Sequence, residues 1–338
     1  MAYSDSSPSN LISKSILKTL AYSDIFDFPL TEEELWKFLI CDKKIKKDEF
    51  EEILESLSRP VIARSETTKH SSQSRYKNNR LPRSLQSLAM TSSGYYCLIG
   101  REQIISKRKR NLPEVDKKFK IAQKVAKHLA KIPTIMFIGI SGSLAMEDAE
   151  EDDDIDFFII TNTNKLYSTR LTMLLVLEKL KVRRKRHDKN PANKICVNLL
   201  IDESEMSFRS DRQDLYIAHE IAQIKPLFQR NNMYYKFLEA NSWLQKFLPN
   251  FEISSSHFSE KGLPDAVRDD KLIIIFKIID IFLPETLTRL LQTAYMRNHK
   301  KNETVTKHLI GFHPMDYRVH ILNNLRLKYQ QLGLLTNL

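Results

Sequence analysis

Glycine is scarce in this chain of 338 residues, which contains only seven. This scarcity excludes collagen-like, glycine-linker and propeller-like architectures. The chain also lacks both glycine-rich phosphate-binding motifs, GxxxxGK[ST] and GxGxxG, so a nucleotide site of the P-loop or Rossmann type is absent. The sequence therefore excludes two common types of nucleotide-binding site.

Cysteine and long apolar runs are rare as well. Cys41, Cys97 and Cys196 are scattered without a CxxC pair or a Cys/His ligand spacing, so neither a disulfide framework nor a zinc site is supported. A reduced, cytoplasmic compartment fits this usage. The N-terminus does not have the pattern of a signal peptide. The most apolar stretch, residues 272–283, is too short for a membrane span, which needs roughly twenty apolar residues.

Charge, in contrast, is abundant and unbalanced. The chain carries 53 basic and 42 acidic residues, for a net charge of +11. This balance favours an anionic partner, such as a nucleic acid, a nucleotide or a membrane surface. Hydrophobic residues make up 42% of the chain, so large cores can form, and the length predicts two or three domains.

The first third predicts a winged-helix-like domain over residues 1–110. We expect helices over 10–22, 31–40 and 47–57 and a strand over 95–99. Thr31 and Glu34 form a capping box at the start of the second helix. The third helix would be the recognition helix, but its five acids outnumber the two lysines at its start, Lys46 and Lys47, and would repel phosphates. DNA binding is therefore disfavoured, and packing or protein contact is the alternative.

Residues 59–91 interrupt this domain with a polar, basic stretch that has no sustained period. Its phrases VIARSETTK and RSLQSLAMT resemble the in-frame translation of a dispersed palindromic repeat of bacterial genomes. The resemblance implies a disordered insertion in a surface loop, where insertions are tolerated. The alternative is an ordinary basic loop that binds an anionic partner. Without this stretch, which holds seven basic residues and one acid, the net charge is about +5.

Residues that can carry chemistry lie in the middle third, which we expect to form a domain over 111–210. A buried strand ends in a tight turn at Gly142 and Ser143, where backbone N–H groups and the serine hydroxyl can hold phosphate oxygens. Asp154 and Asp156 then stand at i and i+2 of a strand, so their side chains share a face. Two such carboxylates can bind Mg²⁺, a hard cation that prefers oxygen ligands.

This pattern resembles the nucleotidyltransferase superfamily related to DNA polymerase β. The signature is apolar-Gly-[Gly/Ser], about nine to thirteen residues, then Asp-apolar-[Asp/Glu]-apolar, and here ten residues separate Gly142-Ser143 from Asp154. The resemblance implies transfer of an NMP from an NTP to a hydroxyl acceptor, with two Mg²⁺ ions held by Asp154 and Asp156. It also implies that Gly142 and Ser143 hold the β and γ phosphates. The acceptor, whether a small molecule, a protein or RNA, is unidentified.

The third carboxylate that such enzymes often carry on a neighbouring strand is missing from its expected position. The next apolar strand, 195–202, has Asn198 there. Its amide oxygen can coordinate a metal but is no base. Asp202 lies about 13 Å further along the strand. We therefore expect Asn198 to point into the site and to weaken the position of the catalytic metal.

Residues 211–338 are expected to form a helical third domain. We expect helices over 212–247, 271–296 and 314–332. Tyr216, His219 and His313 are candidate contacts to the acceptor or the base, with structural packing favoured for each. A basic run over 181–187 can contact RNA or the triphosphate, and a solvated linker is the alternative.

The sequence thus predicts an α+β protein with a winged-helix-like N-terminal domain, a mixed-sheet nucleotidyltransferase core and a helical C-terminal domain. The leading function is Mg²⁺-dependent nucleotidyl transfer, catalysed with the help of Asp154, Asp156 and Asn198. One alternative is a catalytically weak or inactive nucleotide-binding protein. Another is a winged-helix DNA-binding regulator with a nucleotidyltransferase-like sensor domain.

Overall fold

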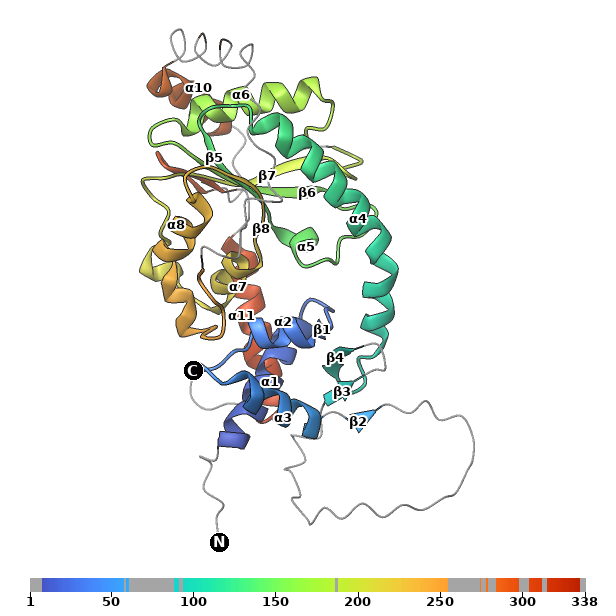
Figure 1. Ribbon diagram of the computed structural model, residues 1–338. Helices are drawn as coiled ribbons and strands as arrows, with labels where there is room; N and C mark the ends of the chain where they lie inside the picture. The colour runs from blue at the N-terminus through green and yellow to red at the C-terminus, as the bar shows by residue number, and fades with distance from the viewer. Residues whose placement is uncertain are drawn as a thin grey trace, which may run out of the picture. The chain divides into compact units, whose positions relative to one another are not determined.

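The computed structural model describes residues 8–57, 59–60, 88–90, 94–185, 188–254, 274, 278, 284–297, 304–311 and 315–334. Most of the expected insertion at 59–91 lies outside these residues, as do His187 and His313. The chain divides into two compact units. Unit 1 comprises residues 1–108, 245–251 and 321–338, and unit 2 comprises residues 109–244 and 252–320 (Figure 1).

Unit 1 contains the three helices that apolar periodicity predicts. They are α1 (Pro8–Asp24), α2 (Glu32–Lys37) and α3 (Lys47–Leu57). The capping box of α2 is present, because Thr31 Oγ1 accepts from the Glu34 N–H at 3.2 Å and the Glu34 carboxylate accepts from the Thr31 N–H at 2.8 Å. A small sheet has the order β1-β4-β3-β2, made of β1 (Leu30–Thr31), β4 (Tyr95–Leu98), β3 (Leu88–Met90) and β2 (Arg59–Pro60). The winged-helix assignment stays a prediction.

Unit 2 is built on a mixed sheet, as predicted. Its strand order is β8-β5-β6-β7-β10-β9, and within the described residues only β6 and β7 pair in parallel. The strands are β5 (Ile135–Ile140), β6 (Ile155–Thr161), β7 (Ile195–Asp202), β8 (Lys225–Gln229), β9 (Thr304–Val305) and β10 (Leu309–Gly311).

Helices cover both faces of this sheet (Figure 1). One face packs into a continuous apolar core against α4 (Gln103–Leu129), α6 (Leu166–Lys179) and α10 (Glu285–Arg297). The other face is covered by α7 (Leu215–Gln223) and α8 (Met233–Ala240), where Phe158 packs on Phe237 with ring centroids 4.9 Å apart. Because side chains alternate along a strand, Asp156 shares the α7 and α8 face with Phe158.

Strand β8 corrects the sequence analysis, which expected helix throughout 212–247. Residues 225–229 pair antiparallel with β5, so this strand belongs to the same sheet as β5, β6 and β7. The domain boundary expected at residue 210 stays a prediction. The strand lies at the sheet edge and contains Pro226, which edge strands tolerate. The five residues of β8 lie between the helical patterns of α7 and α8, and a segment this short shows no clear alternation of apolar and polar residues. Helix α11 (Met315–Gln331) confirms the helix expected over 314–332.

Within the part of the chain that the structure describes, no helix has the length and apolar character needed to cross a membrane.

Candidate functional site

Two carboxylates stand at the start of β6, at the sheet edge where β5 ends. Asp154 immediately precedes β6 and Asp156 is its second residue. One oxygen of each carboxylate and the sulfur of Cys196 all lie within 4.8 Å of one another. Cys196 reaches this cluster because β6 and β7 run parallel and pair Asp156 with Cys196. We call these three residues the acidic cluster.

The acidic cluster disfavours full ionisation. Burial, and next the Asp154 carboxylate, raise the pKa of Asp156 to about 7. The Arg184 guanidinium forms an ion pair with Asp154 and offsets part of this charge. A divalent cation held between the two carboxylates would relieve the same repulsion. The carboxylate oxygens fit a hard cation such as Mg²⁺, whereas the Cys196 thiol, whose pKa is raised by burial, does not.

The turn after β5 brings the backbone against Asp156. Gly142 has a φ of +66°, and a Cβ there would lie 2.6 Å from Asp156 Oδ2, so glycine avoids both backbone strain and this close contact. The Ser141 N–H donates to the Asp156 backbone carbonyl at 3.0 Å. The Ser143 hydroxyl donates to the Asp153 carboxylate at 3.0 Å. The turn expected to hold phosphates therefore lies beside the carboxylate pair.

Asn198 lies on the α7 and α8 face, but it is not the residue beside Asp156. The register of the β6 and β7 pair shifts after Phe157, so Asn198 is the extra residue of a bulge. Its side chain is buried and its amide donates to Ser141 Oγ at 3.5 Å. Cys196 was not among the site residues predicted from the sequence. One signal could have found it, since Cys196 and Asp156 are each the second residue of their strand.

Asp202, the other acid of β7, lies at the far end of the strand. It pairs in register with Thr161 at the opposite end of β6 from the acidic cluster. Its carboxylate accepts from the Ser204 hydroxyl at 2.5 Å and lies 2.7 Å from His308 Nδ1. Asp202 therefore cannot replace the missing carboxylate.

A buried lysine of α4 holds the loop that leads to the carboxylates. Lys118 is fully buried, and its Nζ donates to the carbonyls of Glu151 at 3.0 Å and Asp153 at 2.7 Å. It also contacts Asn193 Oδ1 at 3.4 Å, just before β7. The starts of β6 and β7 are thus tied to the same side chain.

The segment that contains the turn and the acidic cluster matches a known protein family. Residues 123–231 match the family described as polymerase beta, nucleotidyltransferase. This segment belongs to the nucleotidyltransferase superfamily. The match covers about a third of the chain and runs from α4 through β8, so it contains the turn and the acidic cluster. Searches of curated proteins and of solved structures gave no significant match.

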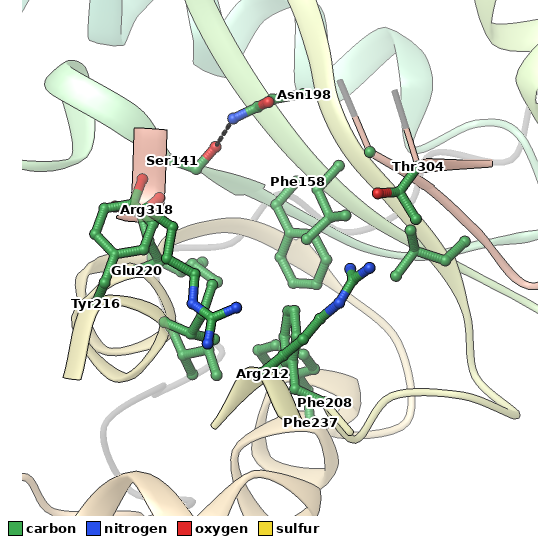
Figure 2. Close-up of a pocket in the computed structure, with 16 residues that line it drawn as sticks. Ser141, Phe158, Asn198, Phe208, Arg212, Tyr216, Glu220, Phe237, Thr304 and Arg318 are labelled. Carbon is green, nitrogen blue, oxygen red and sulfur yellow. Dashed lines mark hydrogen bonds between the residues drawn. The ribbon is translucent and has the colours of Figure 1, made fainter. Parts of the chain in front are cut away.

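A cavity of about 140 Å³ adjoins the acidic cluster of the nucleotidyltransferase domain, on the face covered by α7 and α8. Ser141 and Asn198 line the end nearest Asp156, and Phe158 forms part of the wall (Figure 2). The remaining lining comes from the segment before α7, from α7 itself, and from α8, β9, β10 and α11. The cavity extends the site beyond the residues that carry the family pattern.

The C-terminal candidates differ in their relation to this cavity. Tyr216 lines it, whereas His219 is buried on α7 outside the lining, and burial lowers the pKa of His219 to about 3, which keeps it neutral. Glu220 lines the cavity from α7, although the sequence did not single it out as a site residue. Burial raises the pKa of Glu220 to about 7.

Proposed function

We propose that this chain transfers a nucleotidyl group from an NTP to a hydroxyl acceptor, with Mg²⁺ as its cofactor. The observation that carries the proposal is the Asp154 and Asp156 pair beside the turn at Gly142, within the segment that matches the nucleotidyltransferase family. The family match supports the reaction class. The NTP, the metal and the kind of acceptor are parts of the proposal.

Each residue of the site has a definite role in this reaction. Asp154 and Asp156 would hold Mg²⁺, which when bound neutralises phosphate charge and supports in-line attack on the α-phosphorus. Gly142 lets the backbone approach closely, and Ser143 can turn its hydroxyl from Asp153 toward a phosphate oxygen. Asn198 orients Ser141 at the acceptor side. No carboxylate of β7 lies beside Asp154 and Asp156 in the described residues, so deprotonation of the acceptor hydroxyl would not use one.

A second function, nucleotide binding with little or no turnover, is favoured by Cys196. The position opposite Asp156 holds a thiol rather than a carboxylate. Without a third carboxylate, a second Mg²⁺ ion would have fewer charged ligands, and affinity for hard cations depends on the number of such ligands. The domain would then bind an NTP without releasing pyrophosphate.

The test compares the full chain with its Asp156→Asn variant, which keeps the shape and removes the charge. We expect MgATP or another MgNTP to bind the wild type, and the variant to bind at least about tenfold more weakly, a loss typical of changes at a metal site. The control is Asp152→Asn, an exposed acid of the same loop, which should bind like the wild type.

Pyrophosphate release, measured with varied hydroxyl acceptors, separates the two functions. Release that depends on the acceptor supports nucleotidyl transfer. Binding without release across all acceptors supports the second function. Full MgNTP binding by Asp156→Asn contradicts both.

A further inference from the structure

The cavity beside the acidic cluster contains a cation that no described residue balances. Arg212 and Arg318 both line the cavity, and in the view of Figure 2 their guanidinium groups lie between Ser141 and Asn198 at one end and Phe208 and Phe237 at the other. Arg318 is ion-paired with Asp214. The Arg212 side chain, in contrast, has no hydrogen bond or ion pair within the described part of the chain.

The walls around Arg212 are apolar and aromatic. Phe158 from β6, Phe208 from the segment before α7 and Phe237 from α8 line the cavity, together with aliphatic side chains of α7 and β10. Charge-assisted hydrogen bonds strengthen in such surroundings, and a guanidinium fork matches both carboxylate and phosphate oxygens. The lining therefore fits a ligand that combines an apolar body with an anionic group.

The segment that carries Phe208 and Arg212 is fixed by a buried amide. Asn241, which is fully buried, accepts from the Phe208 N–H at 2.9 Å and donates to the Met206 carbonyl at 2.8 Å. Gln213 Nε2 donates to the Phe208 carbonyl at 2.8 Å. Arg212 thus projects from a segment that is ordered before a ligand arrives, which lowers the entropy lost on binding.

The polar end of the cavity lies against the proposed metal site. Ser141 joins the two, since its N–H donates to the Asp156 carbonyl at 3.0 Å and its hydroxyl accepts from Asn198. A ligand hydroxyl at this end would lie beside the carboxylate pair, with the ligand body along Phe158. Glu220 also lines the cavity, but it forms no ion pair with Arg212 in the described part of the chain.

We propose that this cavity binds the acceptor, a small hydroxy compound with an apolar body and a carboxylate or phosphate group that Arg212 recognises. The inference rests on the nucleotidyl transfer proposed above. A nucleobase is neutral, and the negative charge of an NTP lies on its phosphates, which that proposal assigns to the turn at Gly142. The unbalanced charge of Arg212 therefore fits an anion that belongs to the acceptor.

The test measures binding of small probes to the full chain by calorimetry. The anionic probes are 3-phenylpropionate and phenyl phosphate, which separate a carboxylate from a phosphate, and the neutral probe is 3-phenylpropionamide. We expect at least one anion to bind about tenfold or more tightly than the amide, as a charge-assisted hydrogen bond implies. Arg212→Gln should remove this preference and Arg212→Lys should keep part of it. Arg209→Gln, which changes an exposed arginine three residues away, should leave it unchanged.

The inference would be overturned by binding of neither anion to the wild type, by equal binding of anions and amide, or by an undiminished preference in Arg212→Gln. Displacement of the bound anion by MgATP would also overturn it, since the cavity would then belong to the nucleotide. The proposed function is judged separately by MgATP binding to the wild type and Asp156→Asn. Arg212-dependent anion binding without any MgATP binding would reject the nucleotidyl transfer and leave the cavity as an anion site.

Discussion

At the scale of the residue, Cys196 decides how complete the acidic cluster is. It lies opposite Asp156 in the parallel β6 and β7 pair and contributes a thiol where a third carboxylate would complete a hard-cation site. Asn198 occupies a bulge and contacts Ser141 instead. The two positions are therefore not equivalent, although they are only two residues apart.

We predict that Cys196→Asp strengthens Mn²⁺ binding by about tenfold, because affinity for hard cations rises with the number of charged ligands. Asn198→Asp is the matched comparison and should change the affinity less, since its side chain points to Ser141. Titration of Mn²⁺ followed by electron paramagnetic resonance measures both. A larger gain for Asn198→Asp would contradict the assignment of Cys196 to the third position.

At the scale of the element, α4 contributes the buried Lys118, which contacts the loop that leads to β6. The Lys118 amine reaches from this helix to the carbonyls of Glu151 and Asp153, just before the Asp154 carboxylate. The Asn193 N–H also donates to the Asp153 carbonyl at 3.1 Å, so Lys118 is one of the groups that hold the approach to β6. Positioning of the carboxylates therefore depends on a residue outside the family pattern.

We predict that Lys118→Met lowers the free energy of unfolding by about 2–3 kcal/mol, because the hydrogen bonds from this buried amine to the Glu151 and Asp153 carbonyls are lost. It should also weaken Mn²⁺ binding, since the loop before Asp154 loses its anchor. Lys117→Met removes a half-exposed neighbour that pairs with Glu114 and should change stability by less than about 0.5 kcal/mol. Urea unfolding and Mn²⁺ titration measure the two effects, and equal behaviour of both variants would refute the anchoring role.

At the scale of the whole molecule, unit 1 is assembled from segments far apart in the sequence. Asp24, at the end of α1, is almost fully buried and accepts from Arg101 Nε at 2.6 Å and from Lys328 of α11. Tyr329 of α11 also donates to the Lys18 carbonyl at 3.3 Å. The folding of the N-terminal helices in unit 1 is thereby coupled to the last helix of the chain.

We predict that Asp24→Asn lowers the free energy of unfolding of unit 1 by about 2 kcal/mol, because two cations lose a charged acceptor. Asp27→Asn removes an acid that is about half exposed and contacts Arg101, and it should cost less than about 1 kcal/mol. Urea unfolding followed by helix content compares the variants. A smaller loss for Asp24→Asn than for Asp27→Asn would show that the buried contact does not hold unit 1 together.

Some of this architecture is predictable because it depends on neighbours in the sequence. The helix over 47–57 follows from the spacing of its apolar residues, and α2 begins at a capping box that four consecutive residues specify. Strand β8 could not be predicted in this way, because its pairing with β5 involves residues about ninety positions apart. Cys196 was missed for a similar reason, since the register of the parallel β6 and β7 pair sets which residue of β7 lies opposite Asp156.

The sequence by itself determined the carboxylate pair and the glycine turn of this protein, because two acids at i and i+2 share a face of any strand and glycine permits a backbone conformation that other residues rarely adopt. Only the tertiary structure decided what surrounds them. Lys118, Cys196 and Arg212 come from three elements, and their closeness to the site depends on strand register and helix packing. These are properties of the whole sheet, which no local segment specifies.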